Sequence, residues 1–450
     1  MRTRSLVRTP ERMLMSGKIR FVVSVGALLA AAPTFGWAQE RVPERQGPAA
    51  IEQQAKLREA LSGTRVGSFR LLPKLVIGHG YDSNIYATES DAKGDNVTTV
   101  SPSLRLRSDW KQHALNLAAG ADILRYGTHG SEDVAEYDVS GDGRFDLTDR
   151  TYLFGGAGHS LEHEDRTSPD DVLGEKPTPV HSTQGHLGLG RKGDTFSVQG
   201  GATFERLNYD DVPYTLVPTA TQPGHGYGQQ LTITGDINND DRDRDVLEYG
   251  LRVGAKPGQV WEVFVQGSGN ERRYKDRRDD FGYQRDSSGG GAAVGVGWEL
   301  AKRMQGEVLV GYLQQNYQDP ALKDVGTVDY GGRLNWRATG QTRVALYLDR
   351  SVEETTQPGA SSYLYTVGGV QAKHSLTGSL QLGVRASLGE ADFQGTDRVD
   401  DLVGIGASMQ LFLYRQVYLE PDFQYTARES DLEGADYHRN QYFMRLGMEL

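Results

Sequence analysis

The stretch AEYDVSGDGRFDL, residues 135–147, decides the fold. Every second residue from Ala135 onward is apolar, aromatic or glycine, and the residues between them are charged or hydroxylated. Successive side chains of a β-strand point to opposite faces, so the pattern predicts a strand with one apolar and one water-facing side. The stretch is also longer than the about five or six residues usual for strands of soluble proteins. A tilted strand that crosses a bilayer needs about 9–11 residues, so a membrane-crossing strand fits better.

The same alternation recurs from Phe69 to the end of the sequence, for example in residues 100–110 and 328–337. The connecting segments alternate between short ones, such as 148–150, and long polar ones, such as 164–179. Short turns on one side and long loops on the other are typical of bacterial outer-membrane barrels, and in lipid only a closed barrel satisfies every backbone group of a sheet. We therefore expect an all-β, closed antiparallel transmembrane β-barrel with short periplasmic turns and long extracellular loops. A soluble β-sandwich is the alternative.

Aromatic residues mark the two ends of the expected strands. Four tryptophans lie within a few residues of short connectors and share the parity of the apolar face: Trp110, Trp261, Trp298 and Trp336. Amphipathic rings are favoured at the membrane–water interface, so these four predict a lipid-facing girdle. Five tyrosines lie toward the long-loop ends and are expected to form the opposite belt: Tyr126, Tyr209, Tyr274, Tyr317 and Tyr425.

The strand count depends on residues 209–242. A simple count gives an odd number of strands, whereas a barrel with both termini in the periplasm needs an even number. The strand-like GQQLTITGDINN is flanked on both sides by long polar segments. Treating 209–242 as one large loop with a short β excursion leaves about eighteen barrel strands, and sixteen is the alternative. A barrel of this width encloses an aqueous lumen unless something plugs it.

The N-terminal region has a different composition. Residues 1–38 combine early basic residues with the apolar run FVVSVGALLAAAPTFGWA and small residues before Gln39, which predicts a signal peptide starting at Met1 or Met15. Residues 39–66 are expected to be a periplasmic linker, either a flexible tether or a short docking or plugging helix, and 67–450 the barrel. The sequence contains no cysteine, which rules out disulfides and thiol chemistry.

No catalytic constellation emerges from the motifs. His159, Ser160 and His163 are close in sequence, but alternation puts His159 and Ser160 on opposite faces of a strand. The patterns GxSxG and HExxH are absent. We therefore expect no enzymatic activity, cofactor, metal or nucleic-acid partner.

The polar faces of the strands are densely charged. Ten residues are candidates for lining the lumen: Arg105, Arg107, Asp109, Asp138, Asp142, Arg144, Arg252, Arg333, Arg337 and Arg385. They either form a solvated wall of compensating charges or guide an anionic or hydroxyl-rich solute along rows of forked arginine donors. Acidic loop segments such as SPDDVLGE are expected to be solvated, or to hold divalent cations shared with lipopolysaccharide.

The final stretch QYFMRLGMEL alternates in the same way. It predicts a last strand that pairs with the first one near 69–81. Its apolar face would be read by the barrel-assembly machinery and consists of Tyr442, Met444, Leu446, Met448 and Leu450.

A family resemblance rests on residues 72–147, with Gly80-Tyr81-Asp82-Ser83-Asn84 at the end of the first strand, then Pro102-Ser103-Leu104, Trp110 and Tyr137. A second similarity is RDRDVLEYGLRVG, residues 242–254. These segments resemble β-barrel porins encoded beside capsule and exopolysaccharide biosynthesis genes of Gram-negative bacteria. The resemblance implies an outer-membrane conduit for polysaccharide export, with a periplasmic export component as partner. General or solute-specific diffusion, and a non-conducting structural or surface-binding barrel, are the alternatives.

Overall fold

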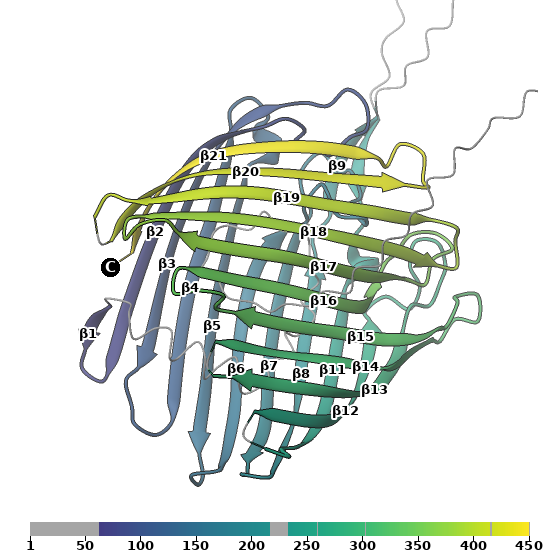
Figure 1. Cartoon of the computed structure of the whole chain (residues 1–450). Helices are drawn as coiled ribbons and strands as arrows, with labels where there is room; N and C mark the ends of the chain where they lie inside the picture. The colour runs from purple at the N-terminus through teal and green to yellow at the C-terminus, as the bar shows by residue number, and fades with distance from the viewer. Residues whose placement is uncertain (1–62, 217–232, 259, 302, 415, 450) are drawn as a thin grey trace, which may run out of the picture.

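The computed structural model describes residues 63–216, 233–258, 260–301, 303–414 and 416–449. One antiparallel sheet of nineteen strands contains the short β1 (Thr64–Val66) and eighteen long strands that form a barrel (Figure 1). The barrel strands are β2 (Phe69–Asp82), β3 (Asp95–Ser108), β4 (Ala114–Tyr126), β5 (Val134–Asp146), β6 (Thr151–His163), β7 (Pro179–Lys192), β8 (Phe196–Tyr209), β11 (Arg244–Ala255), β12 (Trp261–Tyr274), β13 (Ser287–Leu300), β14 (Met304–Tyr317), β15 (Val325–Trp336), β16 (Thr342–Glu354), β17 (Ser362–Ser375), β18 (Leu380–Gln394), β19 (Val399–Phe412), β20 (Val417–Ser430) and β21 (Tyr437–Glu449).

The last strand pairs with the first and closes the barrel. Residues Lys74–Asp82 of β2 lie antiparallel to Gln441–Glu449 of β21, with Tyr81 opposite Tyr442. Neighbouring barrel strands are consecutive in the chain except at one place, where β8 pairs directly with β11. The predicted closed antiparallel barrel and its first-to-last pairing are therefore confirmed.

The segment between β8 and β11 is a long loop with its own hairpin. Strands β9 (Val212–Leu216) and β10 (Ile233–Ile237) pair only with each other. The predicted β excursion in 209–242 and the count of eighteen strands are thus correct, and sixteen is excluded. In the described part of the chain, helical structure is confined to two short 3-10 turns, η2 (Gly130–Glu132) and η3 (Asp240–Arg242), and no helix there is long and apolar enough to cross a membrane.

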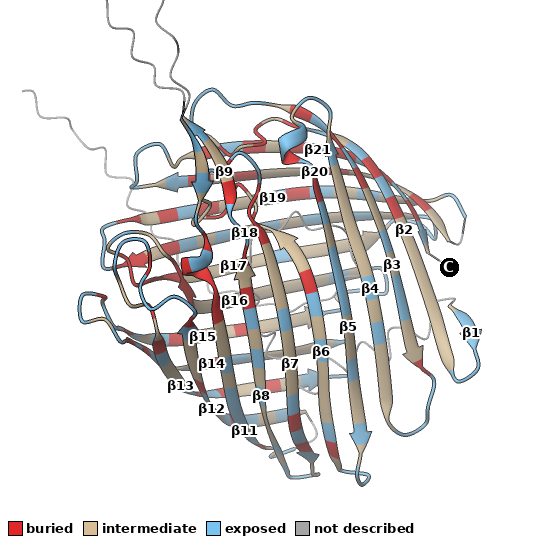
Figure 2. Cartoon of the chain, turned by 180° about the vertical axis from the view of Figure 1, so that it is seen from behind, coloured by how far each residue is buried: buried red, intermediate tan, exposed pale blue. Residues whose placement is uncertain are grey.

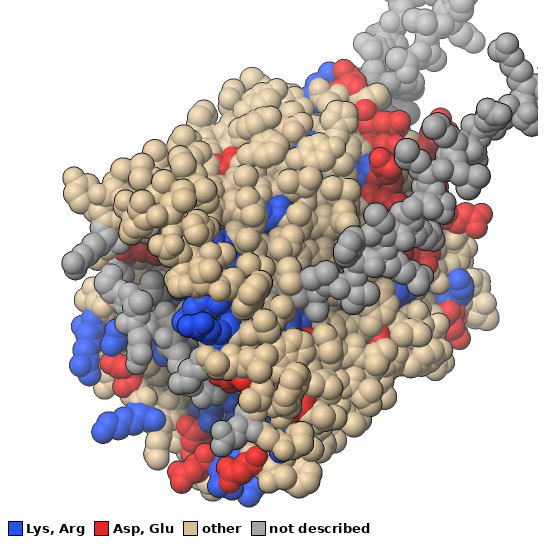
Figure 3. All heavy atoms as spheres, viewed as in Figure 1, with Lys and Arg blue, Asp and Glu red and all other residues tan. Residues whose placement is uncertain are grey.

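The strands alternate between an apolar outer face and a polar inner face. In β21 the side chains of Tyr442, Met444, Leu446 and Met448 are exposed on the outside, whereas Arg439 on the other face is buried. Figure 2 shows exposed, intermediate and buried residues following one another along the strands of the wall. Leu450 lies outside the described residues. The wall facing the viewer in Figure 3 is mostly uncharged, and most charged atoms gather toward the strand ends. Such an outer surface is suited to hydrocarbon.

The apolar outer belt ends before the strands do. On β18 the outward Leu382, Val384 and Leu388 are exposed and are followed by Glu390. Glu390 pairs with Asp401 of β19, which pairs with Glu429 of β20. This charged row marks one edge of the apolar belt, so the strands continue past it into water.

The two ends of the barrel differ in their connectors. We call the end with the short turns the turn end and the opposite one the loop end. All four tryptophans named above lie at the turn end, next to the connectors after β3, β11, β13 and β15. The Trp261 and Trp298 rings are 6.1 Å apart, and Trp110 packs edge-on against Phe69 at 5.4 Å. Their contact with lipid stays a prediction.

Glycine and tyrosine pack against each other across neighbouring strands. A Cβ atom on Gly447 of β21 would lie 2.1 Å from the ring of Tyr418 on β20, and one on Gly269 would lie 2.6 Å from the ring of Tyr249. The rings occupy the space that a side chain would need. This packing accounts for part of the joint excess of glycine and tyrosine in the sequence.

Candidate functional site

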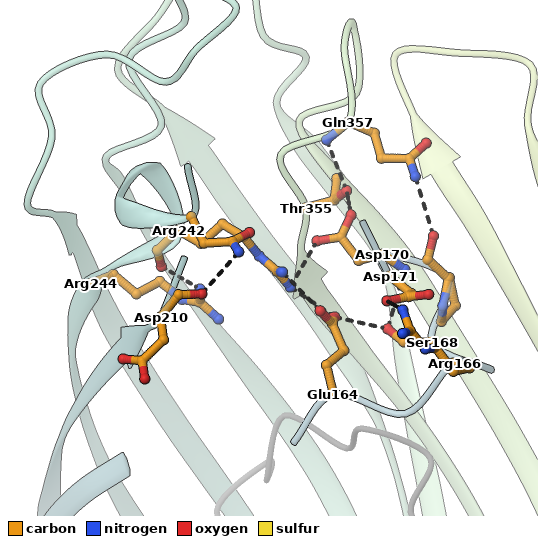
Figure 4. Close-up of polar contacts among 12 residues, drawn as sticks. Glu164, Arg166, Ser168, Asp170, Asp171, Asp210, Arg242, Arg244, Thr355 and Gln357 are labelled. Atoms are coloured by element: carbon orange, nitrogen blue, oxygen red, sulfur yellow. Dashed lines mark hydrogen bonds and ion pairs between the residues drawn. The ribbon is translucent and has the colours of Figure 1, made fainter. Parts of the chain in front are cut away.

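The loop between β6 and β7 folds into the barrel instead of extending into solvent. We call residues 164–178 the inner loop. Its base is closed by the amide of Glu164, which donates to the carbonyl of Thr178 at 2.8 Å. Glu164, Arg166, Ser168 and Thr178 are buried. Figure 4 shows the polar contacts of this loop.

One side of the inner loop is attached to the turn η3. The guanidinium of Arg242 donates two hydrogen bonds to the carboxylate of Glu164, both at 2.8 Å, and lies 3.6 Å from Asp170 (Figure 4). Its guanidinium carbon lies 4.3 Å from the ring centroid of Tyr209. The forked geometry is the strongest form of an arginine–carboxylate contact, so η3 holds the base of the loop.

The middle of the inner loop is held by η2. Arg166 donates to both carboxylate oxygens of Glu132, at 3.0 and 2.7 Å, and to the carbonyl of Gly174. Asp171 lies 3.5 Å from the same guanidinium. Arg166 and Glu132 are both almost fully buried, so each charge depends on the other for compensation.

The tip of the inner loop reaches strands on another part of the wall. Arg439 of β21 binds Asp82 of β2 at 2.7 Å and Asp165 of the loop at 3.3 Å. The carbonyl of Ser168 accepts a hydrogen bond from Arg428 of β20, and that of Pro169 accepts one from Arg398 beside β19. The loop therefore crosses the lumen from the β6–β7 edge to the β19–β21 wall.

A second segment folds inward to meet the inner loop. In the connector between β16 and β17, the hydroxyl of Thr355 donates to Asp170, and the side-chain amide of Gln357 donates to the carbonyl of Pro169 at 3.2 Å (Figure 4). Arg285 lies just before β13 and donates hydrogen bonds to the carbonyls of Thr355 and Ala360, which fixes this connector. The two segments together narrow the loop end of the lumen.

Burial strongly affects the acidic groups of the loops. Desolvation raises the pKa of Asp171 to about 7, against the opposing effect of Arg166. It also raises the pKa of Asp170, and that of Asp241 to about 6. Arg242 has a raised pKa, because the nearby Glu164 outweighs the cost of burying the cation. The inner loop thus carries carboxyl groups whose charge is costly at neutral pH.

A cavity of about 420 Å³ lies against the inner loop. Six carboxylates from the wall strands line it, together with Arg166, Arg242, Arg244 and Arg439. The wall carboxylates are Asp122, Glu136, Asp138, Glu162, Glu205 and Glu354. Within the described ranges, no group of three or more histidine or acidic residues is placed to hold a metal ion. The cavity combines hydrogen-bond acceptors and donors around one space.

The predicted lumen residues are distributed over the whole barrel wall. Of the ten candidates, only Asp138 borders the cavity. Arg105 and Asp142 are exposed on the inner face, and Asp109 lies in the turn after β3, near Arg65 and Arg70.

Several of the other candidates take part in ion pairs or turns. Arg144 binds Asp146, Arg252 binds Glu262 and Glu307, and Arg385 binds Asp422. Arg107 and Arg333 occupy inner positions of β3 and β15, and Arg337 lies in the turn after β15. These ion pairs favour the interpretation of the inner face as a wall of compensating charges over the interpretation as rows of unpaired arginines that guide a solute.

Two predictions about the loop end are wrong. Tyr209, Tyr274 and Tyr126 border the cavity, and Tyr317 donates to the buried Glu354, so these four do not form an outer belt. The acidic segment SPDDVLGE is only partly solvated, because Asp170 and Asp171 are largely buried against arginines of the inner loop and η3, whereas Glu175 is exposed. Strand alternation alone could not locate these contacts, since the partners are far apart in sequence. The predicted separation of His159 and Ser160 holds: His159 contacts Tyr137 on the outer face, and Ser160 borders the cavity.

A closed antiparallel barrel of this size with an apolar outer belt, short turns and an inward-folded loop is the architecture of an outer-membrane porin. The chain belongs to the family described as "Putative beta-barrel porin 2", whose model matches residues 60–450. No match is found among curated proteins.

Similar solved structures include three bacterial proteins. OpdO of Pseudomonas aeruginosa is 12% identical, with 86% of this chain and 98% of that chain covered and a TM-score of 0.44. A BenF-like porin from Pseudomonas fluorescens Pf-5 is 10% identical, with 84% and 99% covered and a TM-score of 0.44. OccAB3 of Acinetobacter baumannii is 9% identical, with 86% and 100% covered and a TM-score of 0.45.

Proposed function

We propose that this outer-membrane barrel is a selective conduit for small hydrophilic solutes, with a size limit set by the inner loop. The observation that carries the proposal is the attachment of this loop to both sides of the lumen. Arg242 and Arg439 hold its first two residues, Glu164 and Asp165, from different sides, and Arg428 holds Ser168. A loop fixed at both sides narrows the path without closing the rest of the lumen.

We call the half of the lumen next to the turn end the turn half, and the half next to the loop end the loop half. The turn half has the features expected of a water-filled path. Arg105 and Asp142 are exposed on its inner face, and a barrel of this width leaves an aqueous interior. With the turn end in the periplasm, as in porins generally, a solute from outside would meet the inner loop first and then the wider lumen.

The cavity beside the inner loop suits a hydroxyl-rich solute. Carboxylates such as Glu136 and Glu205 accept hydrogen bonds, and guanidinium groups such as that of Arg244 donate them. A sugar hydroxyl does both. This chemistry favours solute-specific diffusion over general diffusion.

The test uses the full mature chain in planar bilayers and in liposomes. The wild type is expected to give a small single-channel conductance, and liposomes should swell in monosaccharides but not in longer oligosaccharides. Replacing residues 168–173 by a Gly-Ser linker should raise the conductance severalfold and admit the longer sugars. Shortening the exposed loop 431–434, which connects β20 and β21, is the matched control and should change neither.

Two results would contradict the proposal. Unchanged conductance and sugar size limit after the 168–173 replacement would show that the inner loop is not the constriction. No current from the wild type or the variant would indicate a structural or surface-binding barrel.

Polysaccharide export is a second candidate, favoured by the sequence resemblance around Gly80–Asn84. In that case the inner loop would have to move aside, and residues 39–66, which lie almost entirely outside the described part, would meet a periplasmic export component after signal-peptide cleavage. Unaltered polysaccharide secretion in a deletion strain, together with free passage of small sugars, would rule this candidate out.

A further inference from the structure

The wall of the barrel has one weak seam, between β15 and β16. These strands share only five paired positions, from Gly332 opposite Leu348 to Trp336 opposite Val344. On either side of them, β14–β15 has twelve paired positions and β16–β17 has thirteen. Toward the loop end, residues 325–331 of β15 and 349–354 of β16 have no ladder between them. In lipid, unpaired backbone groups cost free energy, so this gap in the pairing needs a structural or functional explanation.

Toward the loop end, the edges of β15 and β16 overlap, lying one behind the other instead of side by side. In the paired part, Val344 pairs with the exposed Trp336 and Leu348 pairs with Gly332, so both lie on the outer face. Glu354 continues the same alternation on β16, yet its carboxylate accepts hydrogen bonds from Tyr274 and Tyr317. Tyr274 borders the cavity inside the barrel. The outer face of β16 near its loop end therefore lies against the inner face of β12 and β14.

Apolar side chains fill the overlap. One buried cluster contains Tyr317, Leu322, Val325, Val352 and Leu364. Val325 belongs to the inner edge of β15, whereas Val352 and its partner Leu364 belong to the outer side of β16 and β17. The edges are thus held by side-chain packing, which can separate and re-form without breaking backbone hydrogen bonds.

Cationic groups lie at both mouths of the overlap. Outside, Arg350 donates to the hydroxyl of Tyr330 at 3.0 Å, and its Nε has no hydrogen-bond partner among the described residues. Inside, Arg272 contacts Glu354 and donates to the carbonyl of Val352. Val328, beside the outer mouth, is 53% exposed on the outer face. An apolar slot with a guanidinium at its mouth fits an acyl chain with an anionic head group.

We propose that the β15–β16 overlap is a lateral portal between the lumen and the surrounding membrane, and that it binds an anionic amphiphile with a carboxylate head. The acyl chain lies among Val325, Val352 and Leu364, and the head group pairs with Arg350. Arg350 pairs with Thr366, which pairs with Glu390 of the row at the edge of the apolar belt, so the portal opens at the head-group level of the outer leaflet. This portal does not depend on the passage of solutes past the inner loop.

The test is photolabelling of the full mature chain in liposomes, with a fatty acid that carries a diazirine in its acyl chain. The labelled residues are mapped by mass spectrometry. Label is expected on Leu322, Val325 and Leu364, which are screened from lipid in the closed wall. Label restricted to outer positions such as Val384 and Leu388 of β18, two strands away from β16, would overturn the proposal.

Cross-linking the seam supplies a matched control, because the chain has no cysteine of its own. Val328 and Val352 would face each other if the register of the paired part continued. A bifunctional maleimide joining cysteines in Val328→Cys/Val352→Cys should abolish label on Leu322 and Val325. The same reagent on Leu334→Cys/Leu346→Cys, which already pair, should leave it unchanged. Persistent label in the locked seam would contradict a lateral route.

The head-group preference has its own variant. Arg350→Gln should lower labelling by the fatty acid severalfold and leave labelling by a neutral diazirine monoacylglycerol unchanged. A diazirine lysophosphatidic acid tested beside the fatty acid distinguishes a phosphate head from a carboxylate, and stronger label from the lysophosphatidic acid would overturn the carboxylate assignment. Equal labelling of the wild type by charged and neutral probes would overturn the anionic assignment.

Discussion

The turn half and the loop half of the lumen use the same residue types for opposite purposes. In the turn half, Arg105 and Asp142 are exposed on the inner wall. In the loop half, Arg242 and Arg439 are buried in ion pairs that connect loops to strands. An arginine on an inner face can therefore be a solvated wall residue, or a structural tie, by which we mean a buried residue whose ion pairs join a loop to a strand. Which of the two it is depends on whether a loop covers it.

This difference has an energetic basis. A buried charge without its partner costs several kcal/mol, whereas an exposed ion pair contributes roughly 0–1 kcal/mol. We therefore expect the loss of a buried charge in the loop half to lower stability, and the loss of an exposed charge in the turn half to change ion selectivity with little effect on stability. The four predictions below test this contrast, from the largest expected effect to the smallest.

Arg439→Met is expected to destabilise the barrel most. It leaves the buried carboxylate of Asp82 uncompensated, along with that of Asp165, and removing one partner of a buried pair costs about 3–5 kcal/mol. Urea unfolding in detergent, followed by the loss of heat-modifiable mobility on gels, measures the change. The double variant Arg439→Met/Asp82→Asn should recover part of it, and a loss no larger than that of Arg105→Met would contradict the contrast.

Raising the pH should loosen the inner loop. The folded-state pKa of Asp171 is about 7, above its ordinary value of 3.8, because burial outweighs Arg166 and Arg242 and acts together with Glu164. A raised carboxyl pKa means that the folded loop binds the proton more tightly than the free loop does. The stabilisation is therefore complete below about pH 4 and declines as the pH rises toward 7.

Single-channel recording from pH 5 to pH 8 tests this expectation. Open-state fluctuations of the wild type should increase with pH over that range. Asp171→Asn cannot ionise and should reduce the dependence, whereas Asp142→Asn, in the exposed turn half, should retain it. A wild-type record that is the same at both ends of the range would count against the mechanism.

Trp298→Ala tests the outer surface at the turn end. The substitution removes the ring that lies 6.1 Å from Trp261, and an aromatic pair of this kind contributes about 0.5–1.5 kcal/mol beyond its burial. We expect a modest loss of stability in urea unfolding and no change of conductance. A loss as large as that of Arg439→Met would mean that the girdle, not the buried network, is the main structural tie.

Arg105→Gln is expected to have the smallest effect on stability. Arg105 is exposed on the inner wall, and surface substitutions of this kind usually change stability by no more than about 0.5 kcal/mol. Reversal-potential measurements should instead show a small shift toward cation selectivity, because one fixed positive charge is lost from the water-filled half. Unfolding much below the wild-type urea midpoint would show that Arg105 is a structural tie after all.

The sequence predicted the wall much better than the contents of the lumen. The period of two in residues 135–147 and 441–449 depends only on local chain geometry, and it identified the strands, their faces and the closure. Tyr274 and Tyr317 follow the same alternation but lie at the loop end, where the polar side of the strand meets a folded loop. Position along the strand suggested a belt, but the parity of both tyrosines is opposite to that of the exposed Val265 and Val310 on the same strands. Alternation itself therefore places them inside, where they donate to Glu354.

The sequence by itself determined a closed barrel of about eighteen strands, with sixteen as the alternative, the apolar outer face and the tryptophans at one end, because each follows from alternation and turn length. Only the tertiary structure decided that the inner loop enters the lumen, that Arg242 binds Glu164, and that β15 and β16 are not paired toward the loop end. Those features join residues far apart in the chain. Local periodicity carries no information about which distant charge will neutralise a buried one.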